Sequence, residues 1–209
     1  MAETLTYDSL VQDIKDYAER TDEPFVAQVP RFIMLAENRL ASEIKGLGFL
    51  RATTFNLTIS EPTYAKPARW RETKDISLLV GSVRTFLKPR GYEYCRLLSS
   101  EAAADGVPTV YSDYDYEHFY IAQPPAAAYS CELMYYERPE PLSDTKQTNW
   151  TTQYAPQLLL YAALIEAQPF LKLPERIQEF QGLYDRAAGM LMKEDGARVT
   201  DSSVVRNKQ

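Results

Sequence analysis

Apolar residues in the first 45 positions recur every three to four residues, which is the spacing of an amphipathic helix. The first run has Thr6 as a candidate N-cap and ends at the turn 21–24. Its apolar positions are Tyr7, Leu10, Val11, Ile14, Tyr17 and Ala18. The second run follows Pro30, which a helix tolerates near its start, and Gly46 is a natural stop. Its apolar face consists of Phe32, Ile33, Ala36, Leu40 and Ile44. We therefore predict helices over about 6–20 and 30–45.

From residue 53 onward the pattern changes to an alternation of apolar and polar positions, which is typical of half-buried strands. The first alternating run contains Thr53, Phe55, Leu57 and Ile59. The predicted strands cover about 53–59, 72–80, 83–88, 109–114, 117–123 and 129–137, with a short helix near 89–99. The connections between these strands look too short for a parallel crossover, so we expect an antiparallel sheet.

Residues 158–167 are apolar on nearly every side of a predicted helix, with Glu166 as the one charged interruption. A helix of this kind has to be covered all round, either by other helices of the chain or by a partner. We place it within a helix over 152–171. A last helix is predicted over 174–193, with Ile177, Phe180, Tyr184, Ala187 and Leu191 on its apolar face. Residues 194–209 show no sustained period and are expected to form an extended tail.

The order of these elements predicts an α+β fold. Two N-terminal and two C-terminal helices would form a four-helix bundle, and the antiparallel β-rich domain would be inserted between the two pairs. The expected parts are an N-terminal helix pair (1–48), the β domain (49–142), a C-terminal helix pair (143–193) and the tail (194–209).

The charge of the chain bears on its partners. The 209 residues have a net charge of −6, which argues against a binder of the nucleic-acid backbone. An acidic wall that DNA slides past without specific binding is compatible with this charge, because like charges repel. No apolar run is long enough to cross a membrane. The fifteen Tyr suit half-exposed strands and subunit contacts.

Little in the sequence indicates catalysis or a cofactor. His118 is the only histidine, which removes most metal-hydrolase arrangements, and no nucleophile elbow or phosphate-binding Gly-rich loop is present. Cys95 or Cys131 could form a catalytic dyad with His118. However, Cys131 lies in a predicted strand, where a small apolar residue is expected. The two cysteines fall in no metal-binding spacing and suit a reducing compartment. We expect no catalytic residues, no cofactor and no metal.

The best candidate for a cation site is the acidic run Asp113, Asp115 and Glu117. These carboxylates would share one face of a strand, but the Gly and the distal Glu of a calcium loop are absent. A hairpin with one solvent-exposed face gives the same pattern of acidic residues, and we prefer that interpretation.

Two other function classes remain open. Tyr114, Tyr116 and Tyr120 could form the stacking surface of a polysaccharide or single-strand nucleic-acid binder. A carboxylate-based hydrolase could use residues among Glu132, Glu137 and Glu166. Trp70, between Arg69 and Arg71, could stack on a base or anchor its loop, and we favour the anchor. As subunit contacts we nominate Tyr114, Tyr116, Tyr120 and Trp70.

Four segments in order resemble the adaptor (head-to-tail connector, head-completion) proteins of tailed bacteriophages. They are Phe32–Leu40, with the pattern IxLAExR, the loop Tyr64–Trp70, Tyr135–Ser143, with YxxRPxxLS, and Tyr154–Ala167, with LLLYxALxEA. The resemblance covers about residues 6–195. It implies a structural virion protein and no enzyme.

The resemblance also implies partners and a location. Such adaptors form a homo-oligomeric ring, typically of twelve copies, in the neck between capsid and tail, after synthesis in the host bacterial cytoplasm. The ring joins the portal protein above to a tail or nozzle protein below and lines the DNA channel. The family's C-terminal tail grips the portal, a role that would fall here to Arg198, Val199, Val204, Val205, Arg206 and Lys208.

Overall fold

The computed structural model describes residues 4–101 and 106–199. The fold is α+β, as predicted, and the chain divides into two compact units. The helical unit combines Met1–Phe49 with Arg138–Gln209, and the β unit is Leu50–Glu137. The elbow at 138–142, which sequence analysis assigned to the β domain, lies in the helical unit, because the Leu142 N–H is hydrogen bonded to the helix residue Glu37.

The first helices of the helical unit are α1 (Tyr7–Ala18), α2 (Glu23–Val26) and α3 (Val29–Glu43). α1 begins where the pattern predicts, because the Thr6 hydroxyl accepts a hydrogen bond from the Ser9 N–H at 3.1 Å. The predicted turn at 21–24 leads into the short helix α2, which has Pro24 in its first turn. α3 has Pro30 at its start and ends before Gly46, since Ile44 is already extended.

The later helices are α5 (Trp150–Tyr154), α6 (Pro156–Leu171) and α7 (Glu175–Val199). The predicted helix 152–171 is divided at Ala155, which leaves helical geometry (φ −138°, ψ 47°). Pro156 has no N–H to continue the preceding helix and instead starts the next one. α7 continues six residues beyond the expected end at Lys193, so the predicted extended tail is helical from Glu194 to Val199.

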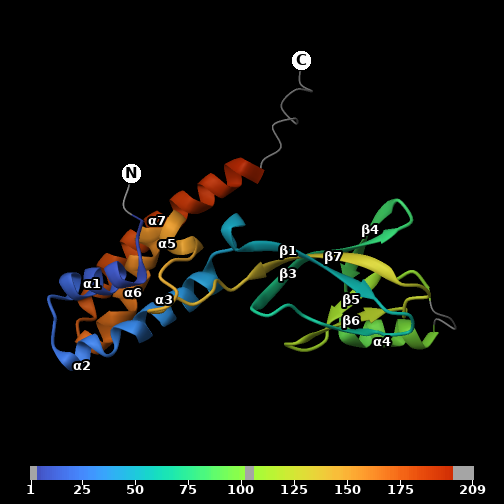
Figure 1. The fold of residues 1–209 in the computed structure, drawn as a ribbon, viewed down its shortest axis with the longest axis horizontal. Helices are drawn as coiled ribbons and strands as arrows, with labels where there is room; N and C mark the ends of the chain where they lie inside the picture. The colour runs from blue at the N-terminus through green and yellow to red at the C-terminus, as the bar shows by residue number, and fades with distance from the viewer. Residues whose placement is uncertain (1–3, 102–105, 200–209) are drawn as a thin grey trace, which may run out of the picture. The chain divides into compact units, whose positions relative to one another are not determined.

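α6 is the centre of the helical unit and contacts α1, α3, α5 and α7 (Figure 1). Its apolar residues are therefore covered by helices of the same chain, including Leu158, Leu159, Ala162, Ala163, Leu164 and Ile165. This cover explains how a helix that is apolar nearly all round is accommodated without a partner.

The β unit contains a seven-stranded sheet in the order β1-β7-β3-β4-β5-β6-β2. The strands are β1 (Leu50–Leu57), β2 (Thr63–Ala65), β3 (Trp70–Val80), β4 (Val83–Pro89), β5 (Val110–Asp113), β6 (His118–Ala122) and β7 (Tyr129–Glu137), and α4 (Tyr92–Glu101) follows β4. β2 lies within the expected loop and was not predicted; it pairs with β6 at three positions.

The sheet is mixed, so the prediction of a wholly antiparallel sheet was wrong. β4 and β5 pair in parallel, with Lys88 opposite Val110 and Pro89 opposite Tyr111. The physical reason is the connection between them, which contains α4 and is long enough for a crossover. The other strand pairs of the described chain are antiparallel.

Strands from all parts of the sheet bury side chains in one core. This core includes Leu57 of β1, Ile76 and Leu78 of β3, Phe119 and Ile121 of β6, and Leu133 of β7. A smaller cluster lies beneath α4, where Cys95 packs with Val110 and Tyr120. The β unit therefore has its own hydrophobic core.

Candidate functional site

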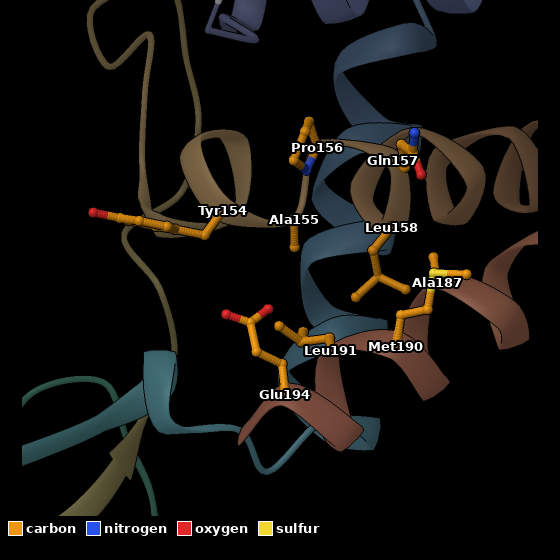
Figure 2. A pocket seen from close by; sticks show the side chains of 9 residues that line it. All are labelled: Tyr154, Ala155, Pro156, Gln157, Leu158, Ala187, Met190, Leu191 and Glu194. Atoms are coloured by element: carbon orange, nitrogen blue, oxygen red, sulfur yellow. The ribbon is translucent and has the colours of Figure 1, made fainter. Parts of the chain in front are cut away.

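The helical unit has an open hollow of about 280 Å³, which we call the α5–α7 groove. It is lined by Tyr154, Pro156, Leu158, Met190, Leu191 and Glu194 (Figure 2). Two of its large side chains are well exposed, Tyr154 at 68% and Met190 at 65%. The lining mixes apolar and polar groups, and the exposed large apolar side chains at the rim make the hollow a candidate docking surface.

The end of α5 presents Tyr154 to this groove. Asn149 caps α5 by accepting hydrogen bonds from the N–H groups of Thr151 (3.0 Å) and Thr152 (3.2 Å). Within the single turn that follows, the rings of Trp150 and Tyr154 stack with their centroids 5.7 Å apart. The cap and this stacking hold Tyr154 at the side of the groove.

A second hollow adjoins the groove and shares Tyr154, Leu191 and Glu194 with it. Its floor includes Asp195, whose buried carboxylate accepts a hydrogen bond from the Leu47 N–H at 2.7 Å. Glu194 forms an ion pair with Arg198 one turn further along α7. The last turns of α7 are therefore attached to the loop that follows α3.

Glu37 connects two of the segments that carry the family resemblance. Its carboxylate is buried on α3 and accepts hydrogen bonds from the Leu142 N–H at 3.2 Å and from Asn149 Nδ2 at 2.9 Å. Burial raises the pKa of Glu37 to about 7, although the two hydrogen bonds act in the opposite direction. The side chain thus fixes the elbow after the β unit and the start of α5 to α3.

A second pair of charges connects α3 to α6. Arg39 Nη2 lies 2.6 Å from Glu166 Oε1, and both side chains are partly buried. Near the end of α3, the Tyr184 hydroxyl on α7 donates to Glu43 Oε2 at 2.6 Å. Glu37, Arg39 and Glu166, each within a resembling segment, are therefore used to assemble the helical unit.

In the β unit, Lys66 and Trp70 anchor the loop between β2 and β3. Lys66 Nζ lies 3.7 Å from the centroid of the Trp70 ring, 3.3 Å from Asp113 Oδ1, and donates to the Asp115 carbonyl at 2.6 Å. Only 3% of the Lys66 side chain is exposed. These contacts favour the anchoring role for Trp70. A hollow of about 480 Å³ lies beside them, and Tyr116 and His118 are among its lining residues.

The acidic run at 113–117 forms the turn of the β5–β6 hairpin. Asp115 Oδ1 accepts from the backbone N–H groups of Glu117 (2.6 Å) and His118 (2.7 Å), and Asp115 Oδ2 lies 3.0 Å from His118 Nδ1. These bonds lower the pKa of Asp115 against the opposing effect of desolvation. The described residues contain no group of three or more Asp, Glu, His or Cys able to hold a metal ion.

The nominated tyrosines differ in their surroundings. Tyr116 is the most exposed, whereas Tyr120 is buried beneath α4 with its ring under the Arg96 guanidinium. Tyr114 stacks on Tyr92 with centroids 5.0 Å apart. Tyr120 is thus committed to packing within the β unit, which leaves Tyr114 and Tyr116 on the surface.

The residues considered for catalysis are occupied elsewhere. Both cysteines are buried and free, and burial raises the pKa of Cys131 to about 12. The three candidate carboxylates form ion pairs: Glu132 with Arg84, Glu137 with Arg51 and Arg69, and Glu166 with Arg39. Glu137 and Glu166 are mostly buried within their pairs, whereas the Glu132–Arg84 pair is exposed and contributes little to stability.

The predicted portal-docking residues are only partly within the described chain. Arg198 and Val199 form the end of α7. Val204, Val205, Arg206 and Lys208 lie outside the described residues. The α5–α7 groove and the buried carboxylates of Glu37 and Asp195 were not predicted from the sequence. Trp150 and the glycines at 46 and 48 are the sequence signals that could have indicated close packing next to the α5–α7 groove.

In the part of the chain that the structure describes, no helix is long and apolar enough to span a membrane. The model of the SU10 adaptor protein family matches residues 5–207, and the chain belongs to this family of bacteriophage adaptors. Membership indicates a structural virion protein. None of the curated protein sequences matches the chain.

Proposed function

We propose that the chain is the subunit of an adaptor ring that joins the portal to the tail in the neck of the virion. The observation that carries this proposal is the family match over residues 5–207, which includes both units. The exposed apolar α5–α7 groove supports it, because a subunit that assembles has to keep such a surface for a neighbour. We further propose twelve copies per ring and a four-helix bundle of α1, α3, α6 and α7 in each.

The portal contact is assigned to the end of α7 and the residues beyond it. Arg198 is exposed on the last turn of α7, and Val204, Val205, Arg206 and Lys208 follow in sequence. This segment combines apolar and basic side chains, so it suits an apolar surface that also carries acidic groups. A tail or nozzle protein would bind the opposite side of the ring.

The ring would form part of the DNA channel without binding DNA specifically. A net charge of −6 per subunit gives a surface that repels the phosphate backbone at short range. DNA would then pass through the ring without adhering to its wall.

Mixing the full chain with purified portal rings tests this proposal. Negative-stain images and sedimentation should show an added ring on the portal, and a chain that stays monomeric with portal present contradicts the proposal. A second arm uses a chain ending at Val199. Unchanged portal binding by that shortened chain overturns the role of residues 200–209 and leaves the ring proposal intact.

A further inference from the structure

The outward face of α3 carries apolar side chains that the other described elements leave partly uncovered. Phe32, Ile33, Ala36, Glu37 and Leu40 point into the helical unit and are buried. Arg31, Met34, Leu35 and Asn38 occupy the opposite face at helical spacing and are exposed. Met34 is 46% exposed and Leu35 38%. We call these four residues the α3 stripe.

The stripe and the α5–α7 groove are two different surfaces of the helical unit. α3 and α7 both pack on α6 (Figure 1). No α3 residue is among those that line the groove. Two unlike surfaces on one subunit are what a head-to-tail contact requires, and such contacts repeat around a ring when the rotation closes. An isologous dimer would instead use one surface twice.

The size and lining of the groove favour side chains as its occupant. Its volume of about 280 Å³ lies below the range of roughly 300–1,000 Å³ that is usual for small-molecule sites. Leu158, Met190 and Leu191 give it an apolar lining. Methionine side chains adapt to irregular gaps, so Met190 and Met34 are suited to fill a contact between two copies.

The charges of the two surfaces are complementary. Glu194 lies at the rim of the groove, and Arg31 lies one turn before Met34 and Leu35 on α3. Glu194 already pairs with Arg198, and an exposed carboxylate has further acceptor sites for a second guanidinium. Local pairing of this kind matters because two copies with a charge of −6 each repel one another overall.

We propose that Met34 and Leu35 of one copy insert into the α5–α7 groove of the next copy, with Arg31 facing Glu194. This contact rests on the proposed ring and identifies the surface through which neighbouring subunits touch.

Disulfide cross-linking of the full chain on portal rings tests the contact directly. Leu35→Cys combined with Met190→Cys should give a ladder of covalent multimers under mild oxidation, and each single variant should give none. The native Cys95 and Cys131 are buried and contribute little background. Leu35→Cys with Gln178→Cys, on an exposed position of α7 outside the groove, is the matched control.

The outcomes separate the contact from the ring. If rings form but no ladder of covalent multimers appears, the proposed contact is wrong and the ring proposal is unaffected. If no rings form on the portal, the proposed function itself is wrong. Covalent dimers from Met190→Cys alone would mean a groove-to-groove contact and contradict the proposal. Faster maleimide labelling of Met190→Cys after deletion of residues 200–209 would make that segment the occupant, and would also contradict it.

A charge exchange provides an independent measurement. Arg31→Glu and Glu194→Lys should each weaken ring formation by about five- to tenfold, and the double variant should recover much of the loss. Thermal unfolding of the free proteins shows whether each variant is folded. Equal losses in the single variants with a further loss in the double variant would overturn the pairing.

Discussion

The indole of Trp150 lies over Gly48, in the space that a side chain at position 48 would need. A Cβ built on Gly48 would fall far inside van der Waals distance of three carbons of the Trp150 ring system. The same ring also contacts Phe49, with centroids 5.1 Å apart. Gly48 therefore allows the aromatic residues next to the α5–α7 groove to pack against the loop after α3.

We expect Gly48→Ala to destabilise the helical unit by about 1–3 kcal/mol, because an added methyl group overpacks a filled site. Urea unfolding followed by circular dichroism measures the change. Gly189→Ala is the matched control, since nothing lies within 4 Å of a Cβ built there on α7. It should be neutral or stabilising by up to about 1 kcal/mol, as expected for Gly to Ala in an exposed helix. Similar losses in both variants would contradict the role of the Trp150 contact.

The buried carboxyl of Glu37 predicts a pH dependence of stability. Its pKa rises from 4.5 to about 7 in the folded protein, so the folded state binds the proton more tightly than the unfolded state. The stabilisation is therefore complete below about pH 4.5 and is lost as the pH rises through 7, by an amount on the order of 2–3 kcal/mol.

Glu37→Gln should abolish this dependence while keeping an oxygen that accepts from the Leu142 N–H and from Asn149. Glu37 also acts on Tyr7, whose pKa is raised mainly by burial and which stays neutral over this range. The free energy of unfolding, measured between pH 5 and 8, should be flatter for the variant. Parallel curves for the two proteins would exclude Glu37 as the titrating group.

The hydrogen bond between Tyr184 and Glu43 should stabilise the attachment of α7 to the end of α3. Tyr184→Phe removes the hydroxyl that donates to the carboxylate at 2.6 Å and keeps the buried ring. We expect a loss of about 1.5–3 kcal/mol, the usual range for a bond to a charged group. A double-mutant cycle with Glu43→Gln should give a coupling energy clearly above zero, and additive effects would mean that the bond contributes nothing.

Lys66→Met should destabilise the β unit while nearly preserving the volume of the side chain. The change removes the cation over Trp70 and the donor to the Asp115 carbonyl. A loss of about 1–2 kcal/mol is expected from a desolvated cation–π contact and a hydrogen bond. The fluorescence of Trp70, read in a Trp150→Phe background, should shift in the folded state. An unchanged spectrum with unchanged stability would refute the anchoring role of this loop.

The two cysteines should not react with thiol reagents in the folded protein. Both side chains are buried, and burial raises the pKa of each thiol, so little thiolate is present at neutral pH. A colorimetric disulfide reagent should modify both only after denaturant is added. Rapid reaction of either thiol under native conditions would contradict the packing of Cys95 beneath α4 or of Cys131 in the sheet core.

Segments with a strong apolar period were predicted well from the sequence. Features that depend on tertiary contacts were not. The period of α1 and its Thr6 cap located that helix almost to the residue, since both signals are local. The break at Ala155 was missed because the apolar pattern continues across Pro156, which fits the first turn of a helix as well as a kink. The parallel pairing of β4 with β5 depends on where α4 packs, which the spacing of strands does not reveal.

The candidate site was harder to predict than the fold. A carboxylate on a helix is normally placed toward solvent, so Glu37 and Asp195 gave no sign of burial in the sequence. Their partners, Leu142 and Leu47, donate through backbone N–H groups, which every residue type except proline possesses. The groove itself forms where the end of α5 and the start of α6 lie beside residues 187–194 of α7.

The bond between Asp195 and Leu47 has a mechanical consequence. The end of a helix usually frays first, but here a buried carboxylate holds the last turns of α7 on the loop after α3. A pull on the chain beyond Val199 would therefore load the Asp195 bond before it could unwind the part of α7 that precedes Asp195. For a segment proposed to bind the portal, this arrangement transfers tension into the folded helical unit.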